Sequence, residues 1–365
     1  MTRKINWVKI QNYILLFFFF SVVAAASYHG YFTKWTIRDD FNGIKIMLEN
    51  EAPPPFIYRR LMIEIVQNTI KIIPQNIKEN CEENYKSNNY IANQYKKANV
   101  LEKYILEYYL LYYLTYFFLL GTMFLMRETF INVTQNKLAG TGVAVVFTLL
   151  FPLFENGGGY WYDFGEIFFF ALFLYFITSE KFEQSKTLYI FFPIFTILAS
   201  YNKESFLFFI ATLFPFFATK FGNKKACCLI VFYMFLAGIT YLFVRYNYAP
   251  DNTKGSFIFY QLQYHIDRIF EGWGQTDIFY GVLFGRGTHW SYILLIFILI
   301  KLVWKKIPTV FKRHAYIALI ITTPLYLLAC TPGELRNFSL LYPAFWVLIA
   351  FYLKDNFLLN DKKVE

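Results

Sequence analysis

Two adjacent carboxylates, Asp39 and Asp40, follow Arg38 directly after the first long apolar run of the chain. When two carboxylates lie side by side, each raises the pKa of the other, which suits one of them to act as a general base. Carboxylate oxygens are also good ligands for Mg²⁺ and Mn²⁺. We therefore predict that Asp39 or Asp40 is the catalytic base, that the pair is a candidate Mg or Mn site, and that Arg38 contacts the substrate. The alternative is a solvated helix end.

Helical spacing separates two further cations, Arg59 and Arg60. Residues that repeat every three or four positions share one face of a helix. Arg59 aligns with Ile63 and is predicted to point toward the protein or the lipid, where a phosphate is a natural partner for a guanidinium. Arg60 aligns with Glu64, and we expect these two side chains to form a solvated ion pair.

A glycine turn at 157–159 precedes three aromatic residues, Tyr160, Trp161 and Tyr162, and the acid Asp163. One interpretation is a helix start at the membrane interface, because carboxylates favour helix amino termini and Trp and Tyr favour the interface. The other is a surface on which a sugar ring stacks, with Asp163 accepting a hydrogen bond from a hydroxyl group. The sequence leaves both interpretations open.

Other polar residues interrupt the apolar sequence near span ends. Lys203 and Glu204 divide two short apolar segments, and broken helices of this kind often line polar cavities. Arg336, before the last span, either binds a phosphate or pairs with Glu334, and His265 lies on an apolar stripe, where packing is its commoner role. The candidate substrate-binding residues are Arg38, Tyr58, Arg59, Trp161, Asp163, Lys203, Glu204, His265, Glu334 and Arg336.

The composition defines the environment of these residues. Hydrophobic residues make up 57% of the chain and charged residues only 16%, which excludes a soluble globular protein and indicates a polytopic membrane protein. We therefore predict an all-α fold of about ten transmembrane helices. The apolar runs lie at 13–32, 104–126, 138–154, 163–178, 188–199, 205–218, 227–244, 290–304, 315–330 and 338–353.

The positive-inside rule orients these spans. Ten spans place 18 of the 35 Lys and Arg residues on one side, together with only 6 of the 25 Asp and Glu residues. The segment 188–218 is either one long helix or two short ones, and only two short spans keep the basic loops on the same side. Both termini are then expected to be cytoplasmic.

We expect a single integral membrane domain, 1–365, with long outer segments at 33–103 and 246–289. In the first segment, apolar residues between 58 and 73 repeat at helical spacing after three prolines, which predicts an amphipathic helix at the outer interface. The second is predicted to carry another such helix at 256–272. The usual signatures of zinc hydrolysis, ATP hydrolysis and nucleotide-cofactor chemistry do not occur in a suitable context. Cytoplasmic loops and lipid electrostatics explain the net charge of +10 without nucleic acid.

These features together resemble the GT-C class of membrane glycosyltransferases. The resemblance lies in the acidic pair of the first outer loop, the interfacial helix in that loop, about ten spans and the charges of later outer loops. In this class a first-loop Asp is typically the base, and the donor is typically a polyprenyl-phosphate or pyrophosphate sugar. Adjacent Asp39 and Asp40 replace the Asp-x-Asp of the class. The motifs that carry the resemblance are Pro55-Phe56-Ile57-Tyr58-Arg59-Arg60-Leu61, Tyr162-Asp163, Lys203-Glu204-Ser205 and Gly333-Glu334-Leu335-Arg336.

The resemblance implies that the protein moves a sugar, with inversion, from a polyprenyl-linked donor to a glycan or lipid acceptor at the outer face of a bacterial cytoplasmic membrane. Asp39 or Asp40 would deprotonate the acceptor, and Arg59 and Arg336 would hold the donor phosphate. Aromatic residues around Trp161 would stack on the sugar or the polyprenyl chain. Two alternatives stay open. An O-antigen or exopolysaccharide polymerase would use outer-loop arginines on two lipid-linked glycans, and a lipid or glycan transporter would form no covalent product.

Overall fold

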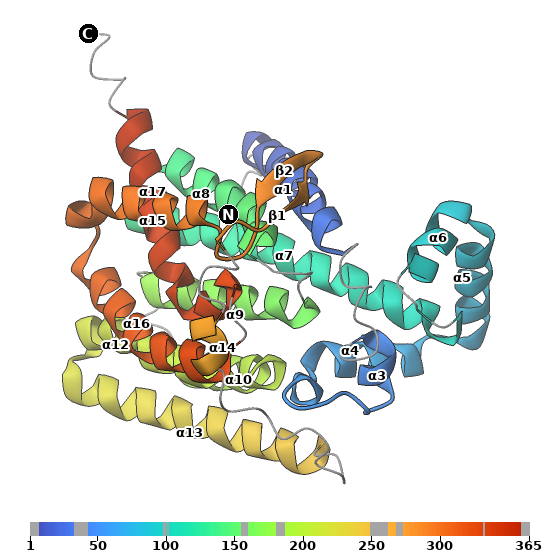
Figure 1. The fold of residues 1–365 in the computed structure, drawn as a ribbon. Coiled ribbons are helices and arrows are strands. Elements are labelled where there is room, and N and C mark those ends of the chain that lie inside the picture. Colours follow the sequence, from blue (N-terminus) through green and yellow to red (C-terminus); the bar gives the residue numbers. More distant parts are fainter. Residues whose placement is uncertain are drawn as a thin grey trace, which may run out of the picture.

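The structure is a computed structural model, and it describes residues 7–32, 43–97, 100, 102–154, 160–179, 187–248, 262–267, 273–330 and 333–358. Helices make up most of this part of the chain (Figure 1). The elements in chain order are α1 (Trp7–Phe32), α3 (Ile44–Leu48), η2 (Phe56–Tyr58), α4 (Leu61–Ile72), α5 (Gln75–Ser87), α6 (Asn89–Lys97), η3 (Glu102–Tyr104), α7 (Ile105–Thr134), α8 (Lys137–Leu150), η4 (Phe151–Phe154), α9 (Trp161–Thr178), α10 (Thr187–Asn202), α11 (Phe206–Thr212), α12 (Phe214–Phe221), α13 (Asn223–Tyr248), α14 (Leu262–Asp267), β1 (Thr276–Phe279), β2 (Val282–Gly285), α15 (Trp290–Val303), η6 (Trp304–Lys306), α16 (Thr309–Ala329), η7 (Leu335–Leu341) and α17 (Tyr342–Leu358).

Among the described residues, six helical segments are long and apolar enough to cross a membrane. A shorter apolar helix covers Ile190–Asn202. The prediction of a mostly helical, membrane-embedded protein is therefore confirmed at this level. The six segments are Ile10–His29, Glu102–Thr134, Lys137–Phe154, Trp161–Thr178, Asn223–Tyr248 and Leu335–Asn356.

Helix α9 lies at the centre of the bundle. Of the apolar 18-residue stretch of α9, 78% is buried inside the protein, compared with 22% of the corresponding stretch of α1. It packs against α7 on one side and α10 on the other (Figure 1). Close ring contacts fill these interfaces: Phe168 lies 4.8 Å from Phe118 of α7, and Phe173 lies 4.4 Å from Phe192 of α10, between ring centroids. Groups carried by α9 are thereby shielded from lipid.

The chain reverses direction after α10. Phe192 of α10 and Phe217 of α12 lie on opposite sides of the break at 203–205, and their ring centroids are 5.6 Å apart. Such a contact across 25 residues requires that α10 and the α11–α12 pair run antiparallel. The segment 188–218 therefore forms two short helical stretches rather than one long helix, which agrees with the interpretation favoured by the positive-inside rule.

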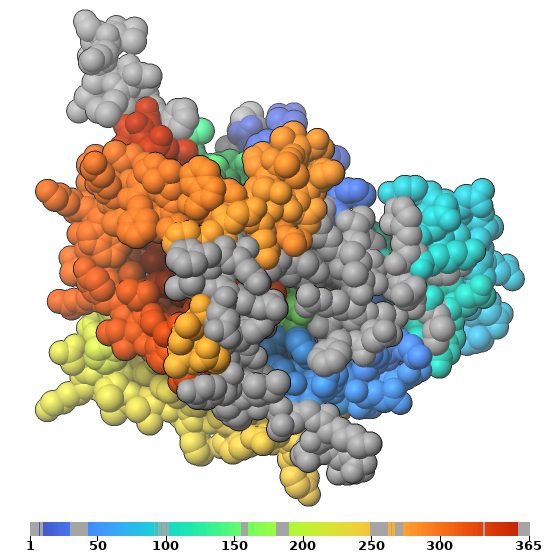
Figure 2. Space-filling model, viewed as in Figure 1, coloured from blue at the N-terminus to red at the C-terminus, as the bar shows by residue number. Residues whose placement is uncertain are grey.

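The predicted amphipathic helix after the three prolines is present as α4. Its apolar face packs on α7, α9 and α10, while Ile72 at its end is exposed. Helices α5 and α6 follow and form a projecting lobe at one end of α7 (Figures 1 and 2). No side chain of α5 is buried, so this part of the outer segment adds little to the core.

The fold agrees with the predicted all-α class, and the described residues contain one short sheet in addition. Strands β1 and β2 form an antiparallel hairpin at 276–285, inside the segment predicted to lie outside the membrane at 246–289. Tyr280 and Gly281 form its turn, and both have positive φ angles, which suits a tight two-residue hairpin turn. The alternation of polar and apolar residues there is too short to distinguish a strand from a loop.

Candidate functional site

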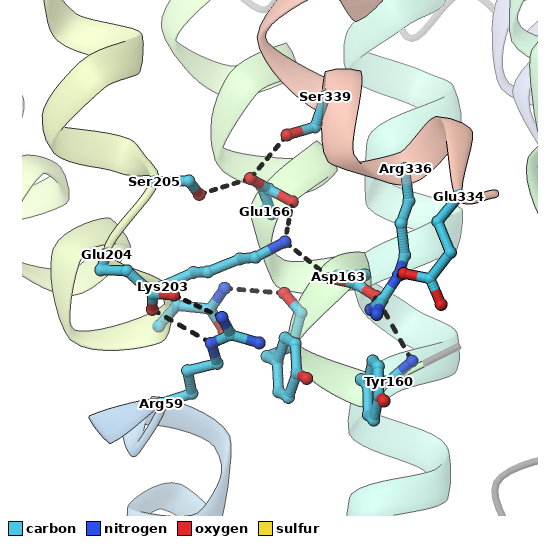
Figure 3. Close-up of polar contacts among 12 residues, drawn as sticks. Arg59, Tyr160, Asp163, Glu166, Lys203, Glu204, Ser205, Glu334, Arg336 and Ser339 are labelled. Carbon is cyan, nitrogen blue, oxygen red and sulfur yellow. Dashed lines mark hydrogen bonds and ion pairs between the residues drawn. The ribbon is translucent and has the colours of Figure 1, made fainter. Parts of the chain in front are cut away.

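Four segments that are distant in sequence bring their charged residues together at one end of the helical bundle (Figure 3). They are the end of η2, the first two turns of α9, the break after α10, and the segment around η7. The charged residues that meet are Arg59, Asp163, Glu166, Lys203, Glu204, Glu334 and Arg336.

Lys203 connects two carboxylates of α9. Its Nζ lies 2.8 Å from Oδ1 of Asp163 and 2.6 Å from Oε2 of Glu166. The two carboxylate side chains are 2% and 3% exposed, and that of Lys203 is 12% exposed. Burial alone would lower the pKa of Lys203, but these two acids raise it above its usual value. The ammonium group is therefore charged and acts as a fixed bridge between α9 and the break.

Arg336 forms ion pairs with Asp163 and with Glu334. Its Nη1 lies 2.9 Å from Oδ2 of Asp163, and its Nε lies 2.7 Å from Oε2 of Glu334. The same Oδ2 accepts a 3.3 Å hydrogen bond from the backbone of Tyr160, which caps the start of α9. Both oxygens of Asp163 therefore have donors within the protein, and the role of Asp163 as an acceptor for a sugar hydroxyl stays a prediction.

Arg59 binds Glu204 through two parallel hydrogen bonds. Its Nε donates to Oε2 at 3.0 Å and its Nη2 donates to Oε1. Burial by itself raises the pKa of Glu204, and the Arg59 guanidinium more than reverses this, so the pKa of Glu204 lies below its usual value. Arg59 is buried, but it precedes α4 and its backbone is not helical, so helix spacing does not explain its orientation. Its partner is a carboxylate of the same chain.

The aromatic residues at the start of α9 lie between the two arginines. Tyr160 and Tyr162 stack at 5.0 Å with nearly parallel rings. The Arg336 guanidinium lies 4.3 Å from the Tyr160 ring, and that of Arg59 lies 4.4 Å from the Tyr162 ring. Figure 3 shows the two guanidinium groups on opposite sides of this cluster. The two arginines therefore do not face one common phosphate position.

The stacking surface predicted for a sugar is not exposed. Trp161 is 2% exposed and Tyr162 is 1% exposed. The Tyr160–Tyr162 stack and the guanidinium contacts described above cover the faces of both tyrosine rings. The interpretation of this motif as a helix start is the one that matches the structure, since the Asp163 carboxylate accepts a hydrogen bond from the backbone N–H of Tyr160, the N-cap residue of α9.

Several polar residues of the site were missed by the sequence-based reasoning. Oε1 of Glu166 accepts hydrogen bonds from Ser205 and, at 2.9 Å, from Ser339. Asn202 donates a 2.8 Å hydrogen bond to the backbone carbonyl of Tyr162. The available signal was Glu166 itself, a second acid three residues after Asp163 and therefore on the same helix face.

The structure also corrects the prediction for Arg60. This residue is 1% exposed, so in its ion pair with Glu64, at 2.9 Å, the cation is buried and only the Glu64 side chain, which is 25% exposed, reaches solvent. Arg60 also donates to the carbonyl of Met47 at 2.8 Å, and its guanidinium lies 4.4 Å from the Tyr248 ring. The expected i,i+4 pair is present, but it ties α4 to α13 inside the protein.

The remaining predicted residues have different outcomes. Arg38, Asp39 and Asp40 lie outside the described residues. His265 is buried, and its Nε2 lies 2.8 Å from the Cys330 carbonyl while its ring packs on Tyr326, which agrees with a packing role. Tyr58 is half-buried, with its ring 6.1 Å from that of Tyr241.

The charge balance of the site is negative. Its ion pairs join three cations and four carboxylates. Within the described residues, no group of three or more His, Cys, Asp or Glu side chains is placed to hold a metal ion. The arrangement can orient side chains and bind an anion by exchange with a carboxylate, because each cation is already paired.

Comparison of the chain with protein-family models, with curated proteins and with solved structures found no match. No family is therefore assigned to the chain, and its function has to be inferred from its own residues.

Proposed function

We propose that the chain is a membrane glycosyltransferase that moves a sugar from a polyprenyl-phosphate donor to a glycan or lipid acceptor at the outer face of a bacterial cytoplasmic membrane. The observation that carries the proposal is the position of Arg59. Its planar, charged group lies at one end of the bundle, in the same outer segment as the acidic pair Asp39 and Asp40. A guanidinium in this position would stabilise the negative charge that develops on a leaving phosphate.

The proposal includes ten membrane passes with both termini in the cytoplasm. Four passes in addition to the six long apolar segments would be α10, α11 with α12, α15 and α16. The chain reversal at 203–205 supports this count. The meeting of residues 160–166, 203–205 and 334–339 at one end also supports this count. Two proposed passes separate the first group from the second, and four separate the second from the third. An even number of passes returns the chain to the same side of the membrane.

In the proposed reaction, Asp39 or Asp40 takes the proton of the acceptor hydroxyl. The acceptor oxygen bonds to the anomeric carbon of the sugar, and the bond between that carbon and the phosphate oxygen breaks with its electron pair on the phosphate. Arg59 stabilises the departing phosphate. Lys203, tied to Asp163 and Glu166, holds the break after α10 in position. Arg336 lies on the other side of the tyrosine pair and would contact a different part of the substrates.

The test is transfer by purified protein reconstituted in liposomes with a labelled polyprenyl-phosphate sugar and a lipid acceptor extract. We expect Asp39→Asn or Asp40→Asn to reduce transfer by about 10²–10⁴-fold, because Asn is nearly isosteric with Asp but cannot accept the proton. Near-normal transfer by both variants would refute this assignment of the base and favour the polymerase. Movement of labelled lipid across the liposome by the wild type, with no glycosidic product, would instead establish a transporter.

A further inference from the structure

We propose that Glu204 occupies the anion subsite of Arg59 in this structure, and that one singly charged phosphodiester group takes its place when a lipid-linked donor binds. This inference rests on the proposed function, because it concerns the donor of that reaction. It goes further by stating where the phosphate binds, what it displaces and which charge it carries.

The first argument is that the position of Arg59 does not depend on Glu204. The Arg59 guanidinium lies 4.4 Å from the Tyr162 ring and 5.5 Å from the Phe56 ring. These two rings would hold the cation in place after the carboxylate has left, since a guanidinium is attracted to the face of an aromatic ring. Two of its nitrogens are presented side by side to Glu204, which is also the geometry in which arginine binds two oxygens of a phosphate.

The second argument is that Glu204 is the most easily displaced carboxylate of the site. Its side chain is 29% exposed, whereas those of Asp163, Glu166 and Glu334 are 2%, 3% and 6% exposed. Among the described residues, Arg59 is the only side chain that binds the Glu204 carboxylate. Glu204 also lies in the break between α10 and α11, so its side chain can turn toward water without disturbing a continuous helix.

The neighbouring pair of Arg60 and Glu64 shows what a permanent ion pair looks like in the same part of the chain. Arg60 is 1% exposed and donates to Glu64 and to the Met47 carbonyl. Tyr248 donates a 2.8 Å hydrogen bond to Glu64, so both partners have additional contacts. Two adjacent arginines therefore have carboxylate partners of different kinds. Glu64 accepts from a second side chain, that of Tyr248, whereas among the described residues the Glu204 carboxylate has no side-chain donor besides Arg59.

The third argument concerns the charge of the ligand. The site already contains one carboxylate more than it has cations. A phosphodiester carries one negative charge, so its exchange for the Glu204 carboxylate leaves the local charge unchanged. A diphosphate diester carries two, and the second charge would be repelled by the buried acids. The site therefore selects a sugar linked through one phosphate.

The experiment measures binding by calorimetry to the purified full-length protein in dodecyl maltoside, a detergent without phosphate. The main probe is farnesyl methyl phosphate, a singly charged diester with a short polyprenyl chain. Dimethyl phosphate tests the same group without a lipid chain, and phosphatidylglycerol tests an ordinary membrane lipid. The methyl ester of farnesyl diphosphate tests the doubly charged group.

We expect Glu204→Gln to lower the dissociation constant of farnesyl methyl phosphate by about tenfold or more, because the competing carboxylate is gone. The matched control Glu64→Gln should bind like the wild type, and Arg59→Gln should not bind measurably. The diphosphate ester should bind the wild type about tenfold more weakly than the monophosphate ester. Dimethyl phosphate and phosphatidylglycerol should both bind more weakly than the farnesyl monophosphate ester.

Equal affinity of the wild type and Glu204→Gln, with binding lost in Arg59→Gln, would overturn the exchange while leaving the phosphate contact of the proposed function intact. Wild-type affinity in Arg59→Gln would overturn that contact itself. Tighter binding of phosphatidylglycerol than of the farnesyl ester would assign the subsite to a membrane lipid and refute the donor. If Glu204→Gln does not fold, Glu204→Asp replaces it. Its shorter side chain weakens the paired contact, so an affinity no better than that of the wild type would refute the exchange.

Discussion

Replacing Lys203 should destabilise the protein, because this residue is the cation that two buried carboxylates share. In Lys203→Met, Asp163 keeps Arg336 as its partner, whereas Glu166 keeps only hydrogen bonds from hydroxyl groups. A buried carboxylate that loses its cation costs about 3–5 kcal/mol, and the two remaining serine donors place the expected cost at the lower end, about 3 kcal/mol. With an unfolding entropy of about 2.1 cal/mol/K per residue, each kcal/mol shifts the midpoint of this 365-residue chain by roughly 1.3 °C, so the midpoint should fall by roughly 4 °C.

A second substitution distinguishes the charge interaction from a loss of packing. Its effect on the unfolding midpoint should have opposite signs in the wild type and in Lys203→Met, which a loss of packing alone would not produce. Glu166→Gln should lower the midpoint of the wild type, because it removes one partner of the charged Lys203. In the Lys203→Met protein the same change should raise the midpoint, because it removes a buried carboxylate that has no cation. Lys306→Met is the matched control. Lys306 pairs with Asp355 in a position where its own side chain is 57% exposed, so its loss should cost less than about 1 kcal/mol.

The assay is tryptophan fluorescence of detergent-purified protein, heated at one fixed rate because unfolding of a membrane protein need not be reversible. If Glu166→Gln lowers stability equally in both backgrounds, within about 0.5 kcal/mol, the two residues do not interact and the account of the site is wrong.

Three further outcomes follow from the structure and the proposed topology. In a cysteine-free background, a cysteine at Asn88 should react with an impermeant thiol reagent in intact cells and one at Asn223 should not, and labelling of Asn223 would contradict the ten-pass topology. Gly165→Ala should cost about 1–3 kcal/mol in thermal unfolding, because its Cβ would lie 2.4 Å from Oδ1 of Asn202; a neutral effect would show that this helix contact can relax. The pKa of Glu204 is lower in the folded protein than in the unfolded chain, so its ion pair contributes fully to stability above the unfolded-state pKa, roughly 4.3. This contribution to stability is lost as the pH falls through the lower pKa of the folded state. The stability difference between wild type and Glu204→Gln should therefore be constant from pH 8 to pH 5, and a decrease within this range would contradict the pairing.

The features that the sequence predicted correctly are those that depend on local patterns. The apolar runs marked most of the long helices, and the spacing of apolar residues after the three prolines marked α4. The break at Lys203 and Glu204 was visible because two charged residues interrupt an apolar stretch. Each of these signals lies within a window of about twenty residues, where periodicity and length are informative.

The partners of the charged residues could not be predicted in the same way. Arg59 precedes α4 instead of lying on its face, and its partner Glu204 is 145 residues away along the chain. Arg60 was assigned to solvent because its own helix gave no sign that α13 covers it. The serines that bind Glu166 come from two other segments, and a serine near a span end has no distinctive pattern. Such pairings depend on tertiary packing, which the local pattern of a single sequence does not reveal.

The bridge between Lys203 and α9 has a consequence for biosynthesis. Asp163 and Glu166 are made before Lys203, and about 40 residues separate them along the chain. If α9 entered the bilayer alone, both carboxylates would face lipid without a cation, which is unfavourable by roughly 2.5–3.5 kcal/mol for an Asp at mid-membrane depth and less near a helix end. The release of α9 from the insertion machinery is therefore expected to wait for α10, so that the two helices leave together as a neutralised hairpin, whereas Arg336 joins them only when synthesis is nearly complete.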